Sequence, residues 1–122
     1  MKSLATLCVF MSFAVPASSY GTTLLTPMLF NQSGAQTTCD VVNVGTRPIS
    51  VDMKLFDDIG NQVAGITASV APAQGSHLTG TVSTGFGIFR YCTFTYSGSK
   101  NAVQAGMENS VGPSTNLHVD AH

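Results

Sequence analysis

The chain has 122 residues, of which only 9% are charged, well below the ~25% of ordinary soluble domains. Five Lys and Arg residues stand against six Asp and Glu residues, so the formal net charge is −1 at pH 7. The cations are scattered and form no basic stripe, which argues against a nucleic-acid partner. The length allows one domain with a modest core and excludes a second domain.

The first residues have the pattern of a secretory signal peptide. Met1 and Lys2 give a positive start, an apolar run covers 4–15, and small residues follow a proline. Cleavage after Ala17 and cleavage after Ser19 both fit. The apolar run is shorter than the ~20 residues that span a bilayer, so we expect no membrane span after cleavage. We predict a signal peptide at 1–19, a single domain at 20–122, and a secreted or periplasmic location.

Short apolar segments bounded by Gly, Pro or Asn follow in chain order, and none shows a helical period. In the segment 49–57, apolar side chains alternate with polar ones, as in a half-buried antiparallel strand. The predicted strands are 22–30, where Pro27 marks an edge or a bend, 36–44, 49–57, 62–70, 76–83, 88–96 and 102–107, with a last edge strand or a tail at 117–119. We therefore predict an all-β fold, a small immunoglobulin-like antiparallel β-sandwich of about seven strands.

Cys39 and Cys92 remain after the signal peptide, with its Cys8, is removed. In an oxidising compartment two such cysteines form a disulfide, which we expect to be structural. Neither belongs to a Cys-x-x-Cys unit, which argues against a redox-active or metal-binding pair. The positions match the inter-sheet bridge of immunoglobulin domains, although the chain has no tryptophan and the tyrosine-corner position is Arg90.

Arg90 conflicts with the pattern of its own strand, because it shares a face with Cys92 and Phe94. An unpaired arginine in a core is costly. We expect a β-bulge or a strand end to expose it; the alternatives are a buried functional arginine and an ion pair with Asp40 or Asp52.

The spacing C-x3-N-V-x3-P-x2-V-x-M-x-L-x-D-x2-G resembles a motif of short exported bacterial proteins of unknown function. It consists here of Cys39, Asn43, Val44, Pro48, Val51, Met53, Leu55, Asp57 and Gly60. The later segments "APAQG" and "YCTFTYSGSKNAVQAG" extend the resemblance from Cys39 to Gly106. It implies a two-cysteine, immunoglobulin-like β-sandwich and export, and it brings no known activity and no catalytic residues.

Two polar groups are candidates for metal binding. In the C-terminal "HVDAH", an extended chain places His118, Asp120 and His122 on one side, as a Zn²⁺ or Cu²⁺ site needs. The alternative, which we expect, is a solvated tail without metal. The turn "DDIGN" has oxygen donors suited to Ca²⁺, but it is far shorter than a calcium loop, so we expect an ordinary hairpin turn.

Phe89 and Tyr91 lie on the strand face opposite Cys92. If exposed, they suit a sugar or a protein partner; if covered, they belong to the core, and we expect partial coverage. The sequence has no nucleophile elbow and no phosphate loop, so we predict no enzyme, no catalytic residues and no cofactor. We predict a non-enzymatic exported protein with a binding or structural role in the cell envelope or outside the cell. The alternative is a small secreted inhibitor or effector of a protein partner. The oligomeric state stays open.

Overall fold

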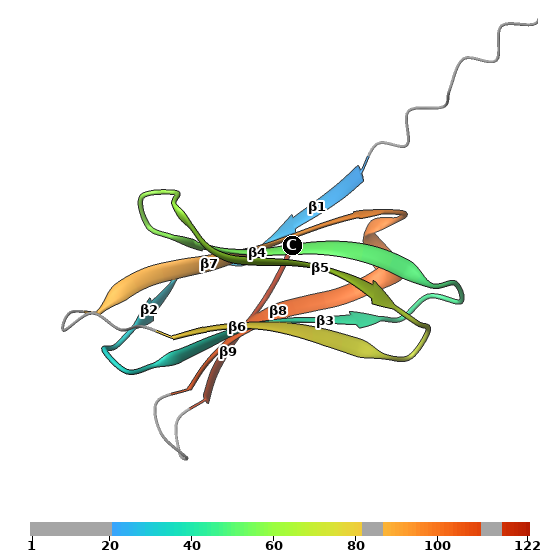
Figure 1. Cartoon of the computed structure of the whole chain (residues 1–122). Coiled ribbons are helices and arrows are strands. Elements are labelled where there is room, and N and C mark those ends of the chain that lie inside the picture. The colour runs from blue at the N-terminus through green and yellow to red at the C-terminus, as the bar shows by residue number, and fades with distance from the viewer. Residues whose placement is uncertain (1–20, 82–86, 111–115) are drawn as a thin grey trace, which may run out of the picture.

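The computed structural model describes residues 21–81, 87–110 and 116–122, which form two antiparallel sheets packed face to face (Figure 1). The elements are β1 (Gly21–Leu25), β2 (Leu29–Asn31), β3 (Gln36–Asn43), β4 (Ile49–Asp57), β5 (Gln62–Val70), β6 (Gly75–Thr81), β7 (Ile88–Ser97), a 3-10 turn η1 (Lys100–Ala102), β8 (Val103–Ser110) and β9 (Asn116–Asp120). The prediction of a small β-sandwich is confirmed. The predicted signal peptide, 1–19, lies outside the described residues.

Sheet A has the strand order β1-β7-β4-β5, with β2 also paired to β7, and sheet B has the order β6-β3-β8-β9. In Figure 1 sheet A is the upper layer and sheet B the lower one. Period-two alternation in β3, β4 and β7 directs one row of each strand into the space between the layers. The largest fully buried side chains in that space include Phe94, Met53, Leu55 and Met107.

A disulfide between Cys39 of β3 and Cys92 of β7 joins the two sheets through the centre of the core. Both cysteines are 0% exposed. The link closes a segment with a sequence separation of 53 residues, so it constrains a long part of the unfolded chain. The predicted disulfide is thus present, and it joins the two layers.

The edge strand predicted at 22–30 is split into β1 and β2, with Pro27 in the gap. Proline has no N–H to give to a sheet, and the chain bends there. Thr26 provides hydrogen-bond partners for the backbone of β7 at this bend. Its N–H donates to the Cys92 carbonyl at 3.0 Å, and its hydroxyl accepts the Cys92 N–H at 2.9 Å. The hydroxyl therefore takes the role of a backbone carbonyl beside the disulfide.

The loop between β3 and β4, at 44–48, is fastened to the core by Asn43, which is 1% exposed. The Asn43 amide donates to the carbonyls of Arg47 at 2.8 Å and Val70 at 2.9 Å. Its side-chain oxygen accepts the Gly45 N–H at 2.9 Å. These three bonds give the asparagine of the Cys39–Gly60 motif a structural role in holding the turn.

The position of a tyrosine corner is Arg90, but a buried tyrosine, Tyr96, lies four residues after Cys92. It is 3% exposed, and its hydroxyl lies 3.2 Å from the Ser99 carbonyl and 3.1 Å from the Lys100 carbonyl. Burial raises the pKa of Tyr96. The side chain thus fixes the connection through η1 to β8.

The chain end crosses from one layer to the other. Ala121 donates to the Ala105 carbonyl of β8 at 2.9 Å, and His122 and Leu25 exchange backbone hydrogen bonds of 3.0 and 3.1 Å. Figure 1 shows the last residues rising from sheet B to end beside β1. The C-terminal segment is therefore a strand whose end closes one side of the sandwich.

The expectation that Arg90 turns outward is wrong. Arg90 is 4% exposed and stays on the inner face of β7, and the register shift lies instead in the pairing of β4 with β5, at Leu55 and Phe56. Its Nη2 donates to the Thr81 carbonyl at 3.3 Å, while Nε and Nη1 have no partner among the described residues. Burial lowers the pKa of Arg90 and the Asp57 carboxylate opposes that shift. Neither suggested ion pair forms, because Asp52 pairs with Lys54 and Asp40 lies on the outer face of sheet B.

Candidate functional site

Four aromatic side chains lie together at one end of the outer face of sheet A. Phe89 and Tyr91 of β7 are joined by Phe30 of β2 and Phe56 of β4, which are their partners in strand register. We call these four residues the aromatic cluster. Phe30 is 50% exposed and Phe89 is 45% exposed, while Phe56 and Tyr91 are half-buried. Tyr91 is partly covered, as predicted, whereas Phe89 is exposed.

The rings of the aromatic cluster cover parts of one another. Phe56 and Tyr91 are stacked, with centroids 5.2 Å apart and planes 14° from parallel. Phe30 and Phe89 meet edge to face, with centroids 5.3 Å apart. The Phe30 ring also rests on the Gly87 backbone, where a Cβ atom would collide with it. The stacked pair therefore covers one face of Phe56 and one face of Tyr91, the edge-to-face pair covers part of one of its two rings, and such pairs hold the side chains in defined positions.

Two more apolar side chains are exposed in the chain segment that leads to Phe30. Leu25 is 49% exposed and Met28 is 52% exposed. Single exposed apolar residues are common, but a group next to an aromatic cluster is a feature of interaction surfaces. The aromatic cluster and the neighbouring edge segment of β1 and β2 therefore form an exposed apolar area.

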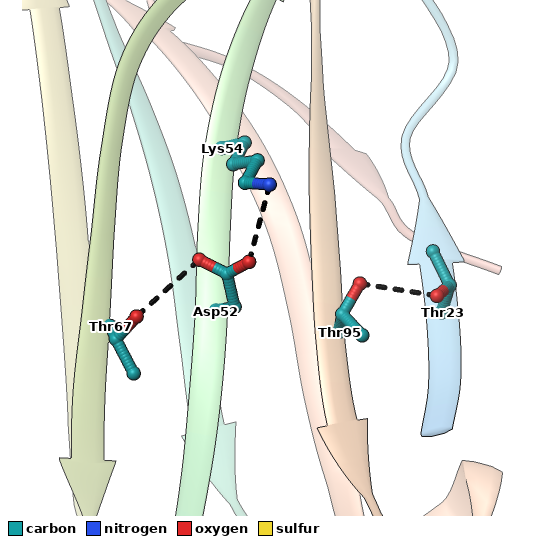
Figure 2. A network of polar contacts seen from close by, with 5 residues as sticks. All are labelled: Thr23, Asp52, Lys54, Thr67 and Thr95. Carbon is teal, nitrogen blue, oxygen red and sulfur yellow. Dashed lines mark hydrogen bonds and ion pairs between the residues drawn. The ribbon is translucent and has the colours of Figure 1, made fainter. Parts of the chain in front are cut away.

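Further along this face lies a network of polar side chains (Figure 2). A row of side chains crosses the four main strands in register, from Thr67 of β5 through Asp52 of β4 and Thr95 of β7 to Thr23 of β1. Asp52 pairs with Lys54 at 3.4 Å and accepts from Thr67 at 3.5 Å, and the hydroxyls of Thr95 and Thr23 are 3.1 Å apart. Both charged side chains are exposed, so their ion pair adds little stability. The row borders the apolar area without adding net charge.

The "DDIGN" segment is an ordinary hairpin turn between β4 and β5. The Asp57 carboxylate accepts the N–H groups of Ile59 at 3.1 Å and Asn61 at 2.8 Å. Gly60 has a φ of 83°, a conformation that favours glycine. The Asp57 oxygen that a bound Ca²⁺ would need thus already accepts two hydrogen bonds within the turn.

The outer face of sheet B collects most of the remaining titratable groups. His118 and Asp120 of the "HVDAH" segment lie on β9, with Nε2 and Oδ1 3.1 Å apart. His122 lies beyond β9, where its backbone pairs with Leu25. Within the part of the chain that the structure describes, no three His, Cys, Asp or Glu side chains converge as a metal site.

Strand register adds residues to this face that the sequence reading did not place there. Asp40 of β3 lies opposite His77 of β6, and Glu108 of β8 lies opposite His118. Partial burial and then the nearby Glu108 carboxylate raise the pKa of Asp40, against a lowering effect of His77 and His118. Ser76, which precedes His77 in β6, lies opposite the buried Val41 and so is on the inner side of sheet B, away from these groups. No signal in the sequence pairs these strands, because their register depends on the whole sheet.

Two open depressions lie at the end of the sandwich that carries the 44–48 loop. One, of about 470 Å³, is bordered by Leu24, Lys100 and Asp120, and the other, of about 480 Å³, by Arg47, Ile49 and Ser99. Neither encloses a cluster of acids, bases and nucleophiles. In the described ranges, no helix is long and apolar enough to cross a membrane.

Comparison with known proteins gives a structural likeness only. No family model matches the chain, and no curated protein matches it. Among solved structures, the crystal structure of Thermotoga maritima 1070 is similar, with a TM-score of 0.55 over 82% of this chain and 91% of that chain, at 10% sequence identity. Identity this low supports a shared fold and nothing about activity.

Proposed function

We propose that the protein is an exported, non-catalytic β-sandwich module, of the kind found in short exported bacterial proteins, that binds a protein partner through the aromatic cluster on sheet A. The observation that carries this proposal is the pair of half-exposed rings, Phe30 and Phe89, on adjacent strands. Their neighbours Leu25 and Met28 extend the apolar surface. Aromatic and Met side chains are enriched at the centres of protein interfaces.

Ring orientation favours a protein over a carbohydrate as the partner. Sugars bind aromatic platforms by stacking on an open ring face. In the aromatic cluster, Phe56 and Tyr91 stack on each other, and Phe30 packs on Phe89 and Gly87. Apolar side chains of a protein can pack against the ring edges that remain exposed.

Export is supported by the N-terminal pattern and by the disulfide. The bridge between Cys39 and Cys92 fits an oxidising compartment outside the cytoplasm. The chain contains only a few charged groups, and on the outer face of sheet A Asp52 is paired with Lys54. The binding surface is therefore apolar, and binding through it should depend weakly on salt.

A three-variant comparison tests the proposal. Mature wild-type protein, Phe30→Ser/Phe89→Ser and the control Ile59→Ser are immobilised and exposed to envelope extract and culture supernatant of the producing cell. Ile59 is a suitable control because it is an apolar residue, 78% exposed, on the turn between β4 and β5. Because Phe30 and Phe89 are half exposed, all three proteins should melt cooperatively with intact disulfides.

We expect one protein band to be retained by wild type and by the control and lost with the double variant. Retention by all three proteins, or by none, contradicts the proposal. Insoluble polysaccharides are tested in parallel by co-sedimentation. Binding to a polysaccharide that disappears in the double variant would assign a glycan, and not a protein, to the aromatic cluster.

A further inference from the structure

We propose that the outer face of sheet B holds a transition-metal ion, Cu²⁺ or Zn²⁺, anchored by His118 and Asp120 and completed by Asp40. This site is separate from the aromatic cluster, which lies on the opposite layer. The strand register places His77, Asp40, Gly106 and Asp120 in one row across β6, β3, β8 and β9. Imidazole and carboxylate groups from several strands are thus brought together by the sheet, and their sequence positions are far apart.

Gly106 is the feature that lets the His118 ring enter this row. A Cβ atom at Gly106 would lie 2.5 Å from His118 Cε1 and 3.0 Å from Nε2. The imidazole therefore lies directly over the glycine, in the space that a side chain would fill. Along the sheet, the order of side chains becomes His77, Asp40, His118 and Asp120.

An open depression of about 170 Å³ lies over Gly106, with Asp40 on one side and His118 and Asp120 on the other. The His118 side chain is 55% exposed and that of Asp120 is 74% exposed. An ion can therefore reach both donors from solvent without any opening of the sheet. Glu108, opposite His118 in register, adds a further negative charge next to the depression.

The spacing of the first two donors suits one metal ion. His118 Nε2 and Asp120 Oδ1 are 3.1 Å apart. Metal–nitrogen and metal–oxygen bonds of about 2.0–2.2 Å, at angles of roughly 90° to 110°, place two ligands about 2.8–3.5 Å apart. An ion can therefore replace the hydrogen shared by Nε2 and Oδ1 without a change of strand position.

The third donor completes the site only on binding. Without an ion, no three such side chains converge in the described residues. Asp40 lines the same depression, and the proposal requires its side chain to reach the ion by rotation or through a bound water. A site with few direct protein ligands and open access binds reversibly, and Cu²⁺ should bind more tightly than Zn²⁺.

The test uses mature protein with its disulfide intact and titrates it with Cu²⁺ and Zn²⁺ by calorimetry. Electron paramagnetic resonance of the Cu²⁺ form reports whether nitrogen is coordinated. We expect one ion per chain, nitrogen coordination, and a loss of affinity of at least about tenfold in His118→Ala. Asp120→Asn and Asp40→Asn should each weaken binding, and the control His122→Ala should leave it unchanged.

Three results would overturn the proposal. The first is that the wild-type protein binds neither ion in a stoichiometric manner. The second is that His118→Ala binds as tightly as wild type, which would place the ion at the chain terminus or elsewhere. The third is that His122→Ala loses as much metal affinity as His118→Ala, which would assign the ion to the C-terminal tail and not to the depression over Gly106.

Discussion

Removal of the disulfide should be the most destabilising change that leaves the backbone intact. We expect Cys39→Ala/Cys92→Ala to lower the free energy of unfolding by about 4 kcal/mol, because the bridge constrains a loop with a separation of 53 residues. Alanine is the right replacement because both sites are 0% exposed and a serine would bury unsatisfied hydroxyls. A domain of this size is typically stable by only ~5–15 kcal/mol, so the loss is a large share.

The assay is urea unfolding followed by circular dichroism and fluorescence. With a slope of ~1–3 kcal/mol/M, the midpoint should fall by roughly 1.3 to 4 M urea. Wild-type protein with reductant but no urea is the control: it should keep its bridge, because both cysteines are fully buried. A loss of free energy below about 1 kcal/mol would refute the view that this link joins the two layers in an energetically important way.

Three further changes test individual contacts. Arg90→Met should leave stability unchanged or raise it by about 1–4 kcal/mol in thermal and urea unfolding, because it replaces a buried cation whose Nε and Nη1 have no partner among the described residues; a large loss would show that the guanidinium is paired. Tyr96→Phe should cost about 1 kcal/mol at neutral pH through loss of the hydroxyl contacts to Ser99 and Lys100. Since the folded pKa of Tyr96 is raised above its ordinary value of 10.0, its contribution is complete below that pH and is lost as the pH rises through the folded pKa. Alkaline melting scans should therefore show a steeper decline for wild type than for Tyr96→Phe, and parallel curves would contradict the assignment. Thr26→Val should cost about 1–3 kcal/mol in urea unfolding, because the Cys92 N–H loses its acceptor; an unchanged midpoint would mean that the backbone rearranges to satisfy it.

The sequence was sufficient to predict features that depend on local patterns. The alternation in 49–57 correctly separates the buried Val51, Met53 and Leu55 from the outward row. That row includes Phe56, which stacks on Tyr91 because β4 and β7 are neighbours. The two cysteines also gave the correct link between the sheets. Such features need only the periodicity of a strand and the chemistry of an oxidising compartment.

Arg90 shows where local reasoning fails. The cost of burying a cation suggested a bulge at that residue, but β7 keeps its alternation and the irregularity lies in the pairing of β4 with β5 instead. Packing of the whole layer determined the face of Arg90, and the side chain reaches the Thr81 carbonyl from the inner side. The preference of the Arg90 side chain for solvent was thus overridden by the register of its strand.

The candidate sites depend on register between strands, which no local pattern contains. Phe89 and Tyr91 were predicted as a pair, but Phe30 and Phe56 join them only through the pairing of β2 and β4 with β7. Likewise, Asp40 meets the His118 segment only because β3, β8 and β9 are neighbours in sheet B. Residues that are 78 positions apart in sequence can therefore face one depression.

Photocrosslinking at the aromatic cluster tests the central claim most directly. A photoreactive phenylalanine analogue is placed at Phe89 in one protein and at Ile59 in another, both are produced in the native cell, and the cells are irradiated. We predict a discrete crosslinked protein adduct from position 89 and none from position 59, although position 59 is the more exposed. The absence of an adduct at 89, or the same adducts from both positions, would contradict a binding role for the outer face of sheet A.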